Sequence, residues 1–156
     1  IRKDVLFFAL PALLVCTAGL AFMVWDLVRQ QGSLTILSVR GIVGLALVFI
    51  GGTLSLVAAV TLRRVYSSTL ITREDHQLIT HGVYRLTRHP IYLGTIMVMM
   101  GLPVVVSSLY GLLTMSALIP LFLNRIKIEE RLLTEEFGDA YRRYQEATSK
   151  LIPFIY

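Results

Sequence analysis

The sequence predicts an all-α membrane protein: a polytopic helical bundle with about four transmembrane helices, a C-terminal helical hairpin and a cytoplasmic amphipathic tail helix. Of the 156 residues, 55% are hydrophobic and only 16% are charged, and the mean hydropathy is +0.69. Soluble domains carry about 25% charged residues, so this composition indicates an integral membrane protein. The length predicts a single domain.

Two N-terminal spans are expected within residues 1–62. The apolar run from Val5 to Trp25 is long enough to cross a hydrocarbon core of about 30 Å. We expect this run to be retained rather than cleaved as a signal peptide, because no clear small-residue cleavage site precedes Asp26. The second span ends at Leu62, and its small residues recur every four positions, which favours close helix packing in lipid. These residues are Gly44, Val48 and Gly52, and separately Gly51, Ser55 and Ala59.

The rest of the chain divides into a loop, a hairpin and a tail. Residues 63–90 are polar and are expected to form a cytoplasmic cofactor loop. Residues 91–123 are too long for one ordinary span and contain Pro103 and Ser107-Ser108, which predicts a hairpin with arms at 91–106 and 109–123. Residues 124–156 form the tail, whose amphipathic helix is expected to break near Gly138.

The distribution of positive charge predicts the orientation in the membrane. Thirteen of the fifteen Lys and Arg residues lie at the two ends or in the loop, whereas Arg29 and Arg40 lie on the opposite side. The positive-inside rule then places both termini and the loop in the cytoplasm. The net charge of +5 fits contact with anionic lipid headgroups, and nothing in the sequence indicates a nucleic-acid partner.

Cysteine and histidine provide no metal site by their spacing. Cys16, inside the first apolar run, is the single cysteine, and this excludes a disulfide within the chain. The three histidines, His76, His81 and His89, lack both the i, i+4 helical spacing and a cysteine partner. We therefore expect no bound metal.

A polar and aromatic stretch, Gly82 to Gly94, precedes the third apolar run. Polar side chains at the edge of a bilayer are tolerated where they face a cavity or one another, so the stretch predicts the rim of a site. His89-Pro90 is expected to start a helix, since Pro suits the first helical position. The alternatives are a purely structural helix start, and an aromatic-belt role for Tyr84 and Tyr92.

A second polar cluster follows the third apolar run. Arg125 and Glu129 are four residues apart on a predicted helix and therefore share a face. The guanidinium suits a carboxylate or phosphate, and the carboxylate suits a cationic ligand. The alternative is a surface ion pair that stabilises a juxtamembrane helix.

These clusters together resemble a known family. Gln77-Leu78-Ile79, the run from Gly82 to Gly94 and the run from Arg125 to Glu130 look like the signature of the isoprenylcysteine carboxyl methyltransferase family, which are integral-membrane enzymes. The resemblance covers about half the chain, from Asp75 to Pro153. It implies that S-adenosyl-L-methionine binds between the loop and the hairpin, and that a lipid or prenylated substrate enters from the bilayer.

The resemblance also implies roles for individual residues. Arg125 and Glu129 would be catalytic, with Arg125 binding the substrate and Glu129 the cofactor. The other cofactor-binding residues would be His76, Gln77, Leu78, Ile79, Tyr84, His89, Pro90, Ile91 and Tyr92. Two departures stand out: the additional N-terminal spans of eukaryotic members are absent here, and Thr69 stands where the family has a cofactor-binding Gln. We expect the membrane to be a prokaryotic inner membrane.

The leading hypothesis is carboxyl methylation of an isoprenylcysteine-like substrate. A carboxylate is already a nucleophile at pH 7, so catalysis would rest on positioning and electrostatics. Three alternatives stay open. They are N- or S-methylation of a phospholipid or small molecule, an NADPH-dependent sterol-type reductase, and a lipid-binding membrane protein without enzymatic activity.

Overall fold

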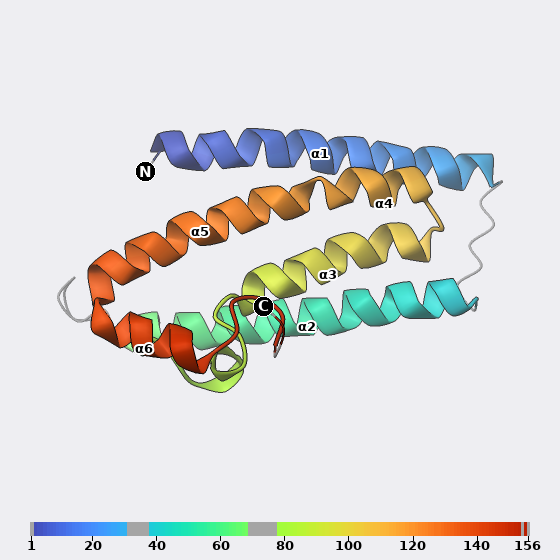
Figure 1. Ribbon diagram of the computed structural model, residues 1–156. Helices are drawn as coiled ribbons and strands as arrows, with labels where there is room; N and C mark the ends of the chain where they lie inside the picture. The colour runs from blue at the N-terminus through green and yellow to red at the C-terminus, as the bar shows by residue number, and fades with distance from the viewer. Residues whose placement is uncertain (1, 31–37, 69–77, 154, 156) are drawn as a thin grey trace. The chain divides into compact units, whose positions relative to one another are not determined.

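The computed structural model describes residues 2–30, 38–68, 78–153 and 155. The described residues form helices joined by short turns, with one isolated bridge between Thr87 and Ser149 and no strand (Figure 1). The predicted all-α class is therefore confirmed. Three helical stretches are long and apolar enough to cross a membrane: Phe8–Arg29, Val39–Arg63 and Leu109–Phe137. A fourth span stays a prediction, because the remaining apolar helix, Pro90–Val105, is shorter.

The first two helices are α1 (Arg2–Arg29) and α2 (Val39–Ser68). α1 continues through Pro11, as membrane helices tolerate. The Ser38 hydroxyl caps α2 by accepting the Gly41 N–H at 3.1 Å. α2 extends past Leu62, where the sequence predicted the polar loop to begin, because hydrophilic residues end the membrane span without ending the helix.

The third apolar run folds as a helix, a turn and two further helices. α3 (Pro90–Val105) is followed by a turn at Ser107, whose φ is +54°, and by α4 (Leu109–Ser116). The Ser108 side chain caps α4 by accepting the Gly111 N–H. α5 (Leu118–Phe137) then runs across residue 123, where a separate tail helix was expected to begin. Charged residues from Arg125 onward favour helix as much as apolar ones do, so the change in polarity leaves the helix intact.

The chain forms two compact units, and the first comprises residues 1–50 and 96–125. In this unit α4 runs alongside α1 (Figure 1). A Cβ placed on Gly111 would lie 2.7 Å from Met23, so this glycine permits a close approach of the two helices. The Ser108 hydroxyl also donates a hydrogen bond of 2.6 Å to Asp26. The first unit therefore joins the turn after α3 to the end of α1.

The second unit comprises residues 51–95 and 126–156. It contains the 3₁₀ helix η1 (Gly82–Arg85) and α6 (Asp139–Ala147). Gly138, with φ +54°, separates α5 from α6, which confirms the break that the sequence predicted there. Ala58, Ile79 and Tyr84 form a cluster of buried hydrophobic residues in this unit.

Candidate functional site

The second unit contains a cavity of about 200 Å³. Its wall comes from the end of α2, the segment around η1, the first turn of α3, the second half of α5, and α6. The lining residues are Leu62, Leu78, Ile79, Tyr84, Arg88, His89, Pro90, Ile91, Tyr92, Glu129, Leu133, Phe137, Tyr141 and Tyr144. Four tyrosines and one phenylalanine thus surround a small number of charged side chains.

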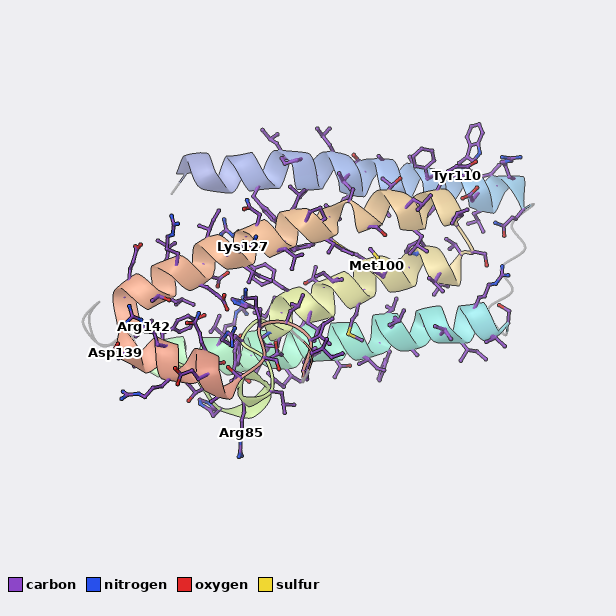
Figure 2. All side chains as sticks on the ribbon, viewed as in Figure 1. Arg85, Met100, Tyr110, Lys127, Asp139 and Arg142 are labelled. Carbon is purple, nitrogen blue, oxygen red and sulfur yellow. The ribbon has the colours of Figure 1, made fainter. Side chains whose placement is uncertain are left out.

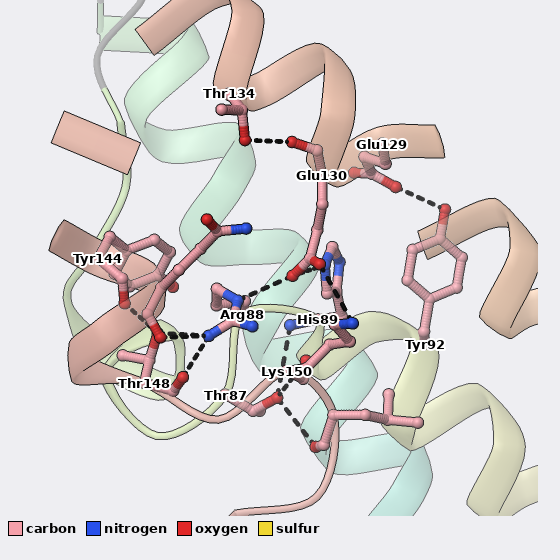
Figure 3. A network of polar contacts seen from close by, with 12 residues as sticks. Thr87, Arg88, His89, Tyr92, Glu129, Glu130, Thr134, Tyr144, Thr148 and Lys150 are labelled. Carbon is pink, nitrogen blue, oxygen red and sulfur yellow. Dashed lines mark hydrogen bonds and ion pairs between the residues drawn. The ribbon is translucent and has the colours of Figure 1, made fainter. Parts of the chain in front are cut away.

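A carboxylate is fixed in this wall by a tyrosine. The Tyr92 hydroxyl, on the first turn of α3, donates a hydrogen bond of 2.8 Å to Glu129 Oε2 on α5 (Figure 3). The two residues lie 37 positions apart in the sequence. A carboxylate among aromatic rings attracts a cationic ligand, because the aromatic faces add to the charge attraction.

His89 lies where the loop enters α3. Its carbonyl accepts the N–H of Leu93 at 3.1 Å, so the helix begins at Pro90, as the sequence predicted. The imidazole is buried, and its ring centroid lies 5.8 Å from that of Tyr92. His89 Nε2 lies 3.4 Å from Glu130 Oε1, but no aligned hydrogen bond joins the two atoms among the described residues.

Behind His89 a buried ion-pair network joins the loop to the C-terminal segment (Figure 3). Arg88 Nε donates to Glu130 Oε1 at 2.9 Å, and the side chains of Arg88 and Glu130 are only 8% and 11% exposed. The Arg88 guanidinium also donates to the carbonyls of Gln145 and Thr148. Lys150 Nζ adds a contact of 3.5 Å to Glu130 Oε2. These contacts connect the segment before α3 with α5, with α6 and with the residues that follow α6.

The neighbouring Thr87 extends this connection. Its hydroxyl donates to the carbonyl of Leu151 at 2.9 Å, and the Arg88 N–H donates to the carbonyl of Ser149 at 2.9 Å. Thr87 is itself almost fully buried. Residues 148–151 are therefore fastened to the polar stretch that the sequence singled out.

Two tyrosines close another side of the cavity. The Tyr144 hydroxyl donates a hydrogen bond of 2.6 Å to the carbonyl of Tyr84, and the Tyr84 hydroxyl donates to the carbonyl of Ala58 at 3.4 Å. Burial raises the pKa of Tyr84 to about 12, and the Glu129 carboxylate adds to this shift. Burial likewise raises the pKa of Tyr144 to about 12. Both hydroxyls therefore keep their protons at physiological pH.

Most of the predicted site residues are brought together here. The cavity lining includes Leu78, Ile79, Tyr84, His89, Pro90, Ile91, Tyr92 and Glu129. His76 and Gln77, which were predicted to bind the cofactor, lie outside the described residues. Arg125 does not line the cavity: it belongs to the first unit, where its guanidinium lies over the Phe8 ring, 5.7 Å from the centroid.

The structure adds lining residues that the sequence analysis did not place in the site. They are Leu62, Arg88, Leu133, Phe137, Tyr141 and Tyr144. By their spacing the aromatic members Phe137, Tyr141 and Tyr144 fall near one face, which predicts an amphipathic helix that lies on the membrane or caps the bundle. In the structure Gly138 divides this segment into α5 and α6, and the three side chains line the cavity. Within the described part of the chain, no group of three or more His, Cys, Asp or Glu side chains could hold a metal ion.

Comparison with known proteins identifies the family. The sequence model of the isoprenylcysteine carboxyl methyltransferase family matches residues 43–135. A probable protein-S-isoprenylcysteine O-methyltransferase of Oryza sativa subsp. indica is 37% identical over 116 residues, which cover 72% of this chain and 61% of the rice protein. Protein-S-isoprenylcysteine O-methyltransferase A of Arabidopsis thaliana is 32% identical over 115 residues, covering 72% of this chain and 58% of the relative.

A bacterial relative also matches. Methanethiol S-methyltransferase 1 of Bradyrhizobium diazoefficiens is 40% identical over 73 residues, which cover 46% of this chain and 25% of the relative. The aligned part of the chain thus spans about three fifths of the length of the plant relatives and a quarter of the bacterial one. The family match covers well over half of the sequence and includes Tyr84, His89, Tyr92 and Glu129. The chain belongs to the isoprenylcysteine carboxyl methyltransferase family.

Proposed function

We propose that this protein is a membrane methyltransferase that uses S-adenosyl-L-methionine and methylates the carboxylate of an isoprenylcysteine-like lipid. The observation that carries the proposal is the Glu129 carboxylate, held by Tyr92 in an aromatic cavity beside His89. The names of the plant relatives support the acceptor. The apolar helices support a site that a lipid reaches through the bilayer.

The residues of the cavity fit this cofactor. When bound, S-adenosyl-L-methionine supplies a methyl group on a sulfonium, and it also carries an ammonium group. Glu129 provides the anion that either cation needs, and the rings of Tyr84, Tyr92 and Phe137 provide aromatic surface. His76 and Gln77, together with Leu78, Ile79, Pro90 and Ile91, are proposed to complete the cofactor-binding set.

Arg125 is proposed to bind the acceptor carboxylate. It lies one helical turn before Glu129 on α5, so both residues project from the same face of that helix. The stacking of its guanidinium on Phe8 leaves the planar fork able to bind a carboxylate. A carboxylate acceptor requires no general base, and the protein would contribute orientation and charge complementarity.

A second candidate is methylation of a small thiol, which the match to the bacterial relative favours. A thiol must lose its proton before it attacks, because the thiolate is the nucleophile. His89 and Glu129 are the groups in the cavity that could accept this proton. The carboxyl and thiol hypotheses therefore differ in whether activity depends on a base.

The proposal includes a location. We propose four membrane spans, with both termini, the loop and the cavity on the cytoplasmic side, on the basis of the uneven distribution of Lys and Arg. The assignment to a prokaryotic inner membrane stays a prediction.

The test is incubation of the purified protein in lipid nanodiscs with methyl-labelled S-adenosyl-L-methionine. The acceptor panel contains N-acetyl-S-farnesylcysteine, phosphatidylethanolamine and methanethiol, and the labelled product is identified by mass spectrometry. We expect label on the farnesylcysteine carboxylate. Label on the thiol alone would establish the second candidate, and no label on any acceptor, together with no binding of S-adenosylhomocysteine, would contradict both.

Two variants of α5 provide the matched comparison. Glu129→Gln keeps the size of the side chain but removes the charge, so we expect it to weaken cofactor binding at least tenfold, or about 1.4 kcal/mol. Glu135→Gln makes the same change at an exposed position of the same helix and should bind the cofactor like the unmodified protein. An equal loss of cofactor affinity in the two variants would show that the effect is not local to the cavity.

A further inference from the structure

Tyr141 has a buried hydroxyl for which the described residues provide no partner. The side chain is 1% exposed and lines the cavity, but its Oη forms no hydrogen bond within the described parts of the chain. A buried hydroxyl without a partner is unfavourable, and such groups are rare in native proteins. An unpaired donor at a cavity wall therefore points to a partner that occupies the cavity.

The neighbouring Tyr144 shows that an unpaired hydroxyl is not a general property of the tyrosines on α6. Both tyrosines line the same cavity, and their rings pack edge to face with centroids 5.9 Å apart. The Tyr144 hydroxyl is paired with the carbonyl of Tyr84. One tyrosine of the pair thus fastens α6 to η1, while the other has a buried hydroxyl for which the described residues provide no acceptor.

The surroundings of Tyr141 make its hydroxyl a donor. Burial raises the pKa of Tyr141 well above its usual value, the Glu130 carboxylate adds to this, and the Arg88 guanidinium opposes it only in part. The phenol therefore stays protonated at all physiological pH values. A protonated phenol in a cavity binds best to an oxygen acceptor on a ligand.

We propose that Tyr141 is a further cofactor-binding residue, which donates a hydrogen bond to an oxygen of S-adenosyl-L-methionine. This inference rests on the proposed function, because it takes the occupant of the cavity from it. The cofactor offers two kinds of oxygen acceptor: the ribose hydroxyls and the carboxylate of the amino-acid part. Together with Glu129, Tyr141 gives the cavity one group for the cationic part of the ligand and one for an oxygen.

The test compares Tyr141→Phe with Tyr144→Phe, which remove one hydroxyl each from the same helix. S-adenosylhomocysteine binding is measured by calorimetry, and the Tm of the ligand-free protein is measured in the same detergent. We expect Tyr141→Phe to raise the Kd by about 3- to 20-fold and to leave the ligand-free Tm unchanged or higher. We expect Tyr144→Phe to lower the ligand-free Tm, because the Tyr84 carbonyl loses its donor.

A second ligand distinguishes the two oxygen acceptors. 5′-Methylthioadenosine keeps the ribose but lacks the amino-acid carboxylate. If Tyr141→Phe weakens the binding of both ligands, the hydrogen bond is assigned to the ribose. If it weakens only the binding of S-adenosylhomocysteine, the hydrogen bond is assigned to the carboxylate. Either result supports the proposal.

Two results would overturn it. The first is an unchanged Kd of Tyr141→Phe for S-adenosylhomocysteine. The second is a ligand-free Tm that falls as far as in Tyr144→Phe, or a failure to fold, since either would mean that the hydroxyl has a partner within the protein. Failure of the unmodified protein to bind S-adenosylhomocysteine would instead refute the proposed function itself.

Discussion

At the residue scale, two arginines close together in the sequence have opposite environments. Arg88 is buried and paired with Glu130, whereas Arg85 is exposed and extends away from the ribbon (Figure 2). Removing one partner of a buried ion pair leaves the other charge uncompensated, which costs about 3–5 kcal/mol. Because Lys150 still lies 3.5 Å from Glu130, we expect Arg88→Met to lower the free energy of unfolding by about 3 kcal/mol, the lower end of this range.

The matched control is Arg85→Met, for which we expect a change within about 0.5 kcal/mol because the side chain is on the surface. Both variants keep an unbranched side chain in place of arginine. Denaturant titration of the protein in mixed micelles measures the difference. A small effect of Arg88→Met would mean that the network around Glu130 contributes little to stability.

The tyrosines around the cavity predict a loss of stability at alkaline pH. In the unfolded chain a tyrosine ionises near pH 10, whereas the pKa values of Tyr84 and Tyr144 are about 12 in the folded protein. Between these values the folded state binds more protons than the unfolded state, so stability falls as pH rises. Each tyrosine contributes at most about 1.4 kcal/mol per pH unit.

Unfolding measured at pH 9, 10.5 and 11.5 checks this slope. Tyr144→Phe removes one of these two groups and should make the slope shallower than in the unmodified protein. An unchanged slope in Tyr144→Phe would contradict the assignment.

Sequence patterns identified some site residues and missed others for physical reasons. His89, Tyr92 and Glu129 were found because polar side chains are unusual beside apolar spans. Tyr141 was not found as a site residue, because a tyrosine on an amphipathic helix is equally compatible with a membrane surface. Only the fold, which turns α6 after Gly138, places this ring against the cavity.

At the element scale, α3 and α2 approach each other closely at Gly94. A Cβ on Gly94 would lie 2.3 Å from the carbonyl oxygen of Gly51 and 2.3 Å from Ser55 Oγ. Since the first of these atoms belongs to the backbone, the helices would have to separate. We expect Gly94→Ala to lower the free energy of unfolding by about 1–3 kcal/mol, as overpacking does.

Gly52→Ala is the control within the same unit. A Cβ on Gly52 would have no heavy atom within 4 Å, so the substitution adds only helix propensity. We expect it to be neutral or to stabilise the protein by up to about 1 kcal/mol. Thermal unfolding of the two variants in one detergent compares their stability directly. A similar loss of stability in both would contradict the close approach at Gly94.

The element boundaries show where a sequence pattern is weak. The predicted small-residue face on α2 was partly correct: Gly44, Gly51 and Ser55 have close neighbours, whereas Gly52 has none. The C-terminal end of α2 and the start of α5 were misplaced, because polarity marks the edge of a membrane and hydrogen bonding marks the end of a helix. The helix break at Gly138 was predicted correctly, and the φ of +54° at this residue is one that glycine adopts readily.

At the scale of the whole molecule, the proposed orientation has a direct test. In a variant with Cys16 replaced by alanine, single cysteines are introduced at the exposed positions Arg40 and Glu146. We expect a membrane-impermeant maleimide to label Arg40→Cys in intact bacterial spheroplasts. Glu146→Cys should be labelled only after permeabilisation, and labelling in the reverse order would contradict the positive-inside prediction.

The connection between Thr87-Arg88 and residues 148–151 has a consequence for biosynthesis. The carbonyls that accept hydrogen bonds from the Thr87 hydroxyl and the Arg88 backbone N–H lie more than sixty positions later in the chain, at Lys150, Leu151 and Ser149. A nascent chain emerging from the ribosome therefore inserts its apolar helices first and acquires these acceptors last. The protein should therefore acquire the ability to bind a ligand in one late step, when translation reaches this segment. Chains stalled before this segment should be inserted in the membrane but should bind no ligand.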